Sequence, residues 1–256
     1  MSYSQAIQLV PTYVLVFFRV TAMMTFAPLF GSTRIPRRVK QLLAMVLAAG
    51  LCASIKGPAT LPTNIWDLTL GIAGEIAFGL AMGTVLSFTF IAAQWAGEMI
   101  GQQMGLNMSE VLDPQFGASS TIIGDFYFML TLDVFLLVGG HRLMIQGARA
   151  SFDALPLLSM GVDRPLLDSI IGLFQACTTL AMQLAAPVLV TMLIVDLALG
   201  CIGKAMPQMN VMSAGLSIRS LIGLLVVVVG LSLTVDVIGD NLIDAMKFVL
   251  VKWSVP

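Results

Sequence analysis

Long apolar runs separated by short polar segments dominate this sequence. The runs cover residues 9–30, 41–55, 68–95, 122–140, 166–203 and 216–238. A helix needs about 20 apolar residues to cross a hydrocarbon core of about 30 Å, and only the run 41–55 falls well below that length. Because open sheet edges cannot face lipid, runs of this kind predict helices. The pattern therefore predicts an all-α integral membrane protein with about six long, partly kinked helices arranged in hairpins.

The run 166–203 is too long for one upright crossing. As a straight helix its 38 residues would extend roughly 57 Å at about 1.5 Å per residue. Pro187 lies near its middle and cannot donate a backbone hydrogen bond. Two structures fit this run equally well, a long kinked helix and a hairpin that turns near Pro187.

Composition agrees with a membrane protein and excludes some functions. The chain is 58% apolar and 11% charged, whereas soluble domains have roughly 45–50% apolar and about 25% charged residues. The net charge is −1, so the chain lacks the basic surface that neutralises the phosphates of a nucleic acid. We therefore expect membrane lipid as a partner and no nucleic acid.

Several charged residues lie inside the apolar runs, where each costs about 2.5–3.5 kcal/mol at the bilayer centre. They are Arg19, Glu75, Asp125, Asp133 and Asp196. Asp125 follows Ser119-Ser-Thr121, which is typical of a helix N-cap, and would lie in a first turn that favours an anion. For Arg19 and Asp133 two interpretations stay open, an ion pair inside the bundle or contact with protein partners or a wet cavity.

Lys and Arg residues do not orient the chain. With six crossings, the segments on each side of the membrane would carry six Lys and Arg residues. The positive-inside rule therefore gives no preferred topology. Either the crossings are assigned wrongly, or the helices do not cross a bilayer in the ordinary way.

Glycines four residues apart indicate close helix packing along the stretch 68–105. Gly79 and Gly83 form one such pair, and Gly97, Gly101 and Gly105 continue the spacing. Small residues at this spacing let helix backbones approach closely in membranes. We expect these glycines to pack a long helix tightly on another helix.

Residue chemistry argues against an enzyme. His141 is the single histidine, and no Ser–His–acid order, P-loop or GxGxxG motif is present. One histidine without a nearby cysteine cannot build an ordinary metal site. We expect no catalytic residues, no metal and no cofactor.

The polar stretch from Gly105 to Thr121 carries Glu110 and Asp113 but no Lys or Arg. Its Asp-Pro step and its glycine favour turns, so this segment should be irregular. Irregular backbone at membrane depth is tolerated only where it is buried in protein or lines a cavity. A solvated surface loop is the alternative.

Six stretches, taken in order, resemble one family. They are F26-A-P-L-F-G31 with I35-P36 and Lys40, G74-E75 with Gly79 and Gly83, L112-D-P-Q-F-G117 with Ser119, G139-G-H141, A186-P187 with D196-L-A-L-G200, and K204-A-M-P-Q-M-N-V211. Together they resemble the FliR/SctT family of type III secretion export-gate proteins, and its flagellar branch in particular. The segment N210–Arg219 departs from many relatives, which are more aromatic there and have Lys near Arg219.

This resemblance implies a function that composition alone does not show. The chain would be a core subunit of the gate through which unfolded flagellar proteins leave the cytoplasm. Its partners would be FliP and FliQ in the gate, FlhB at the cytoplasmic entrance, proximal rod proteins above, and the export substrates in transit. The location would be the bacterial inner membrane at the flagellar basal body.

The resemblance also implies a division of the chain. Residues 1–165 would form a FliP-like helical part that contains the loop 106–120. Residues 166–256 would form a FliQ-like helical hairpin and a C-terminal helix. An assembly that stands largely above the bilayer would explain the tied count of Lys and Arg.

Roles for individual residues follow from the same resemblance. A channel plug would comprise Leu106, Asn107, Met108, Ser109, Glu110, Val111, Leu112, Asp113, Pro114, Gln115, Phe116 and Gly117. Contact with FlhB at the entrance would involve Lys204, Pro207, Gln208, Asn210 and Arg219. Charges at subunit interfaces would be Arg19, Glu75, Asp133 and Asp196.

Two rival interpretations remain. A stand-alone secondary transporter could place a midplane acidic site at Asp133 and Asp196, and it would predict inverted repeats that the sequence does not display convincingly. An injectisome subunit would share the gate mechanism and differ in its cargo. Subunit stoichiometry and the way in which substrate opens the gate do not follow from the sequence.

Overall fold

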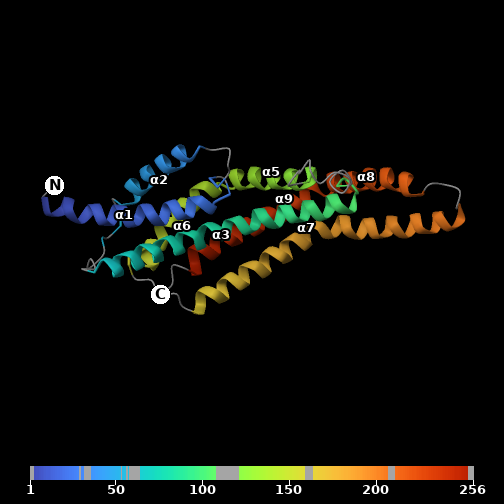
Figure 1. The fold of residues 1–256 in the computed structure, drawn as a ribbon. Coiled ribbons are helices and arrows are strands. Elements are labelled where there is room, and N and C mark those ends of the chain that lie inside the picture. Colours follow the sequence, from blue (N-terminus) through green and yellow to red (C-terminus); the bar gives the residue numbers. More distant parts are fainter. Residues whose placement is uncertain are drawn as a thin grey trace. The chain divides into compact units, whose positions relative to one another are not determined.

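The protein was analysed as a computed structural model that describes residues 3–28, 30–31, 36–52, 54–55, 57, 64–107, 121–158, 164–206 and 211–252. All regular structure in these residues is helical, which confirms the all-α class (Figure 1). The helices are α1 (Tyr3–Phe26), α2 (Arg37–Cys52), α3 (Ile65–Gln103), α5 (Ile122–Leu137), α6 (Gly140–Ala154), α7 (Arg164–Ala205), α8 (Val211–Val229) and α9 (Leu231–Lys252).

Helix lengths are those of an integral membrane protein. Within the described residues, α3 and the segment Ile171–Ala205 of α7 are long and apolar enough to cross a membrane alone. Two bent pairs of helices, α5 with α6 and α8 with α9, bring the number of candidate spans to as many as four. The segment Val10–Phe26 of α1 is a shorter apolar helix.

The apolar runs located most helices and missed two features. Helix α6 was not expected, because it alternates polar and apolar residues instead of forming an apolar run. The run 216–238 contains α8 and α9, which meet at Gly230 with a bend of 57°. The run 166–203 is one continuous helix, α7, with Pro187 inside it, so the hairpin alternative is wrong.

The chain forms two compact units. The first contains residues Met1–Phe88, Gly139–Leu173 and Leu242–Pro256, and the second contains Thr89–Val138 and Phe174–Asn241. Each unit combines residues from both sides of position 165. The two compact units therefore do not coincide with the expected FliP-like part, residues 1–165, and FliQ-like part, residues 166–256. The expected division concerns likeness to other subunits and not compactness, so it stays a prediction.

In the first unit, α1 packs on both α2 and the N-terminal half of α3. Helix α2 lies along α1 and buries Ala44 and Ala48 (Figure 1). A Cβ atom at Gly79 of α3 would overlap the carbonyl oxygen of Arg19, and one at Gly83 would lie 2.5 Å from that of Met23. These two glycines therefore let the α3 backbone touch α1, as their spacing predicts.

In the second unit, the C-terminal half of α3 packs on α5. A Cβ atom at Gly97 would lie 2.6 Å from the carbonyl oxygen of Ile123. Further along, the Phe90 ring stacks edge-on against Phe128 and Phe135, with ring centroids 5.6 and 5.7 Å apart. Aromatic pairs in this arrangement add to the free energy of apolar packing.

Candidate functional site

The first candidate site is the loop between α3 and α5, of which the structure describes both ends. Gly105 follows α3 with φ +74°, a left-handed conformation that glycine adopts without strain and that commonly ends a helix. Leu106 is exposed and Asn107 is half-buried. The other predicted plug residues, Met108 to Gly117, lie outside the described residues.

The far end of this loop is fixed by a helix cap. The Thr121 hydroxyl oxygen accepts a hydrogen bond of 2.9 Å from the Gly124 N–H, and Asp125 follows in the first turn of α5. This cap confirms the N-terminus predicted from Ser119-Ser-Thr121. Its threonine satisfies one backbone donor, and the acid lies where the helix dipole favours it.

Glycines hold the two ends of the loop close together. Gly97 packs against the backbone of Ile123 and Gly124. A Cβ atom at Gly101 would lie 3.3 Å from the Asn107 side chain and 3.4 Å from that of Thr121. Asn107 and Thr121, the described residues on either side of the segment 108–120, therefore both lie against this tightly packed helix pair.

The second candidate site is a buried charge cluster in the first unit. Arg19 of α1 donates its Nε–H to Glu75 Oε2 of α3 at 2.5 Å, and both side chains are at most 2% exposed. Arg19 also donates to the carbonyl oxygens of Ser151 and Leu155 at 3.2–3.3 Å. These carbonyls end α6, so the guanidinium group serves as a cationic C-cap for that helix.

Aromatic rings and a strained turn complete the charge cluster. The guanidinium carbon lies 4.8 Å from the Phe78 ring centroid and 4.3 Å from that of Phe152. Glu75 Oε1 accepts a 3.0 Å hydrogen bond from the N–H of Leu158, whose φ is +67°. Since left-handed backbone is unfavourable for leucine, this bond helps to hold the turn that follows α6.

Arg19 and Glu75 are thus paired with each other inside this chain. The structure therefore supports an ion pair inside the bundle for Arg19, and not contact with a protein partner or a wet cavity. The partner is Glu75, not Asp133. Sequence analysis missed Ser151, Leu155 and Leu158 because backbone groups that accept or donate hydrogen bonds leave no signal in residue identity. Asp133 is exposed on α5.

The remaining charged positions lie on the hairpin of α7 and α8. Asp196 Oδ1 is 2.7 Å from Arg219 Nη2, and both side chains are 37% exposed. Lys204 is exposed in the last turn of α7, where a cation is favoured by the helix dipole. Pro207, Gln208 and Asn210 lie outside the described residues. The structure therefore brings together Asp196 and Arg219, which sequence analysis had assigned to different roles.

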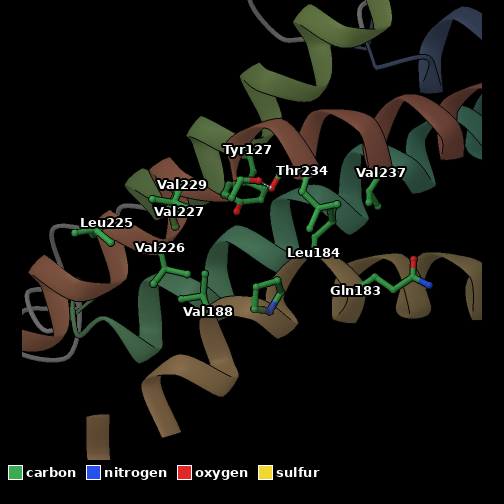
Figure 2. A pocket seen from close by; sticks show the side chains of 13 residues that line it. Tyr127, Gln183, Leu184, Val188, Leu225, Val226, Val227, Val229, Thr234 and Val237 are labelled. Atoms are coloured by element: carbon green, nitrogen blue, oxygen red, sulfur yellow. Dashed lines mark hydrogen bonds between the residues drawn. The ribbon is translucent and has the colours of Figure 1, made fainter. Parts of the chain in front are cut away.

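An apolar cavity of about 270 Å³ lies in the second unit beside Pro187 of α7 and Gly230 (Figure 2). Its polar groups include the Tyr127 and Thr234 hydroxyls, which are hydrogen-bonded to each other. Neither Asp133 nor Asp196 lines it. This cavity is therefore unsuited to an ionic substrate. Within the described residues no three His, Cys, Asp or Glu side chains gather as metal ligands.

Comparison with known proteins adds to this geometry. The family model of the bacterial export proteins, family 1, matches residues 10–245. The chain is 32% identical over 238 residues to the flagellar biosynthetic protein FliR of Bacillus subtilis (strain 168), covering 91% of each chain. It is 28% identical over 209 residues to FliR of Escherichia coli (strain K12), covering 80% of this chain and 78% of that one. The surface presentation of antigens protein SpaR of Shigella flexneri is 26% identical over 213 residues, which cover 83% and 82% of the two chains.

Proposed function

This chain belongs to the bacterial export proteins of family 1, and from that membership we propose that it is a non-enzymatic core subunit of the flagellar type III protein export gate. The observation that carries the proposal is the family match over residues 10–245, together with relatives named FliR that align over most of their length. At the coarser level, the chain is a membrane-embedded component of a flagellar or type III export apparatus and assembles with other components of it.

The partners in this proposal are FliP and FliQ, with FlhB at the cytoplasmic entrance and proximal rod proteins above. The gate would lie in the inner membrane at the flagellar basal body, and unfolded flagellar proteins would pass through it. Large apolar side chains that are exposed on α7 and α8 support an assembly of this kind. Among them are Leu193, Ile194, Leu197, Leu221 and Leu225, each at least 60% exposed.

The segment 106–120 is the part of the chain that would close the resting channel. Support comes from its ends, because Gly105 and the Thr121 cap fix where the loop begins and ends. The apolar Val111, Leu112 and Phe116 would fill a narrow lumen, while Glu110 and Asp113 would stay hydrated or bond to neighbouring subunits. Substrate would displace the loop.

The α7–α8 turn would contact FlhB through Lys204, Pro207, Gln208, Asn210 and Arg219. Lys204 is exposed, which supports such a contact, whereas Arg219 bonds to Asp196 within the chain. Interface roles remain proposed for Asp133, which is exposed, and for Asp196, which is half-exposed. The Arg19–Glu75 pair would act indirectly, by holding the helices that carry the interfaces.

An injectisome subunit is the second candidate function, and the match to SpaR favours it. FliR of Bacillus subtilis and FliR of Escherichia coli are both more identical to this chain than SpaR is, so the flagellar assignment is the one proposed. A stand-alone transporter is the third candidate. The apolar cavity gives it no support, because it includes neither of the acids that a midplane site would need.

Co-expression with the FliP and FliQ of the same genome tests the assembly. The complex would be purified through a tag on this chain and weighed by native mass spectrometry. One discrete, large assembly that contains both partners is the expected result. A homogeneous particle of this chain alone, with neither partner retained in mild detergent, would overturn the gate assignment in favour of a transporter.

Ion leak tests the plug. A variant that replaces residues 108–117 by a glycine–serine segment of the same length would be expressed with its partners. The ion permeability of the membrane should rise, while a variant that replaces the exposed Gln102 and Gln103 by Ala should not leak. A loop replacement that assembles normally and leaves the permeability unchanged would refute the plug.

A further inference from the structure

Helix α2 begins with a cluster of positive charge that no acidic residue on that helix balances. Arg37 and Arg38 are exposed, Lys40 is half-buried, and the helix has no Asp or Glu from end to end. The start of a helix carries a partial positive charge, so three cations in the first turn are disfavoured by the helix itself. Their placement is explained if an anion outside the chain contacts them.

We propose that Arg37, Arg38 and Lys40 bind the phosphate headgroups of anionic phospholipids, and that α2 is a membrane-surface helix whose outer face dips into the acyl chains. No salt bridge to any of these three side chains is present in the part of the chain that the structure describes. Within these residues the three charges have no acidic partner, and Arg in particular can bind an external phosphate through two parallel hydrogen bonds.

The outer face of α2 changes from charged to apolar along one stripe. Arg38, Leu42, Met45 and Ala49 follow one another at helical spacing, and all four are exposed. Leu42 lies about 6 Å and Met45 about 10 Å along the axis from Arg38, at about 1.5 Å per residue. Cations at one end and large apolar side chains on the same exposed face would let a helix that lies along the membrane contact headgroups and acyl chains at the same time.

Other observations on α2 agree with a surface helix. Its 16 residues extend roughly 24 Å, which is less than the hydrocarbon core of about 30 Å. The opposite face is held by the protein, since Ala44 and Ala48 are buried. The Tyr13 hydroxyl of α1 also donates to the backbone carbonyl oxygen of Met45 at 3.3 Å, which attaches α2 to α1. The outer face is free to meet lipid.

The apolar stripe favours lipid over an acidic protein as the partner. A surface that only recognised acidic side chains would gain nothing from exposing Leu42 at 57% and Val46 at 68% beside the cations. Helices with a basic end and an apolar outer face bind anionic membranes through both features together. Helix α6 differs, because its exposed stripe of Arg142, Gln146 and Arg149 contains no large apolar residue.

This inference rests on the chain being embedded in a membrane and not on its role in export. The test uses the full chain in an uncharged detergent, and it measures thermal unfolding with added dioctanoyl phosphatidylglycerol or dioctanoyl phosphatidylcholine. A ligand that binds the folded protein raises its midpoint temperature. The anionic lipid should raise the midpoint at lower concentration than the zwitterionic lipid does, and added salt should reduce the difference.

The test variant is Arg37→Gln/Arg38→Gln/Lys40→Gln, and the matched control Arg142→Gln/Arg149→Gln/Lys204→Gln removes three charges elsewhere. Each basic residue near an anionic surface contributes about a fivefold change in affinity. Because three such residues are removed, the test variant should need about a hundredfold more phosphatidylglycerol for the same rise, while the control should respond as the wild type does. If the triple variant does not fold, Arg38→Gln alone should give about a fivefold change.

Three results would overturn the proposal. The first is equal protection by phosphatidylglycerol in the test variant and the wild type. The second is equal protection by inorganic phosphate, which would make the site one for free anions. The third is loss of co-expressed partner subunits from the test variant with an unchanged response to lipid, which would make α2 a protein contact. None of these results bears on whether FliP and FliQ assemble with the wild-type chain, so the two proposals fail separately.

Discussion

Replacing Glu75 by Gln should destabilise the protein far more than a conservative substitution does elsewhere. The change leaves the Arg19 guanidinium in a site where its side chain is 2% exposed and has lost its counter-charge. Breaking a buried ion pair by removing one partner costs about 3–5 kcal/mol. The carboxylate also accepts from Leu158, and a glutamine oxygen cannot serve both that N–H and Arg19 Nε as a carboxylate does.

Thermal unfolding in detergent gives a measurable form of this cost. One kcal/mol shifts the midpoint by about 2–4 °C for a chain of roughly this size, so about 4 kcal/mol should lower it by roughly 10 °C. Asp67→Asn is the matched control, because it removes one negative charge from the exposed first turn of the same helix. Its midpoint should stay within about 2 °C of the wild type.

A double substitution separates a lost pair from a lost packing contact. Arg19→Met/Glu75→Leu removes both charges and leaves a methionine where the guanidinium faced the Phe78 and Phe152 rings. Because apolar replacement of a complete buried pair is often nearly neutral, the double variant should be less destabilised than Glu75→Gln. The reasoning fails if Glu75→Gln shifts the midpoint by less than about 3 °C, or if the effects of Arg19→Met alone and Glu75→Leu alone add up to that of the double variant.

The other predictions concern helix packing, the loop end and the hairpin. Gly79→Val should destabilise the protein by more than about 2 kcal/mol, because its Cβ would overlap the backbone of α1. Gly50→Ala should stabilise it by about 0.5–1 kcal/mol, because a Cβ atom there meets nothing within 4 Å. The thermal midpoints of the two variants measure the difference. Thr121→Ala should lower the midpoint by about 2–4 °C through the lost cap of about 1 kcal/mol, and Thr121→Ser should restore it. Asp196→Asn should change the stability by less than about 1 kcal/mol, because its ion pair with Arg219 is half-exposed. It should nevertheless reduce the amount of FliP and FliQ that co-purifies. Unchanged co-purification would refute an interface role for Asp196.

Helix positions followed from the sequence because lipid leaves the backbone few choices. Apolar runs long enough to cross a membrane predict helices, and such runs located α1, α3, α5 and α7, while the shorter run 41–55 overlaps α2. The pattern did not show whether α7 turns at Pro187, since neighbouring groups in a membrane bundle can compensate for a missing N–H. Helix α6 could not be predicted from apolar runs because polar residues interrupt its apolar pattern.

Local features of the candidate sites followed from the sequence, whereas long-range pairings did not. The Thr121 cap and the role of Asp125 depend on residues within one helical turn, so they could be predicted. The Arg19–Glu75 pair joins residues 56 positions apart. Sequence analysis identified both residues as unusual but could not decide which of several buried charges is the partner, because that choice depends on which helices pack together.

The Arg19 cluster has a consequence for the order in which the chain is synthesised and inserted. Glu75 follows Arg19 by 56 residues, and Ser151 follows it by 132. At about 5–20 residues per second, Arg19 leaves the ribosome roughly 3–11 s before Glu75 does, and the end of α6 follows several seconds after that. For this interval the first helix carries an uncompensated cation, which must rest at the headgroups or in the insertion machinery. Helix α1 is therefore made before the groups that pair with Arg19, and it reaches its packed position only when α3, and then α6, has been made.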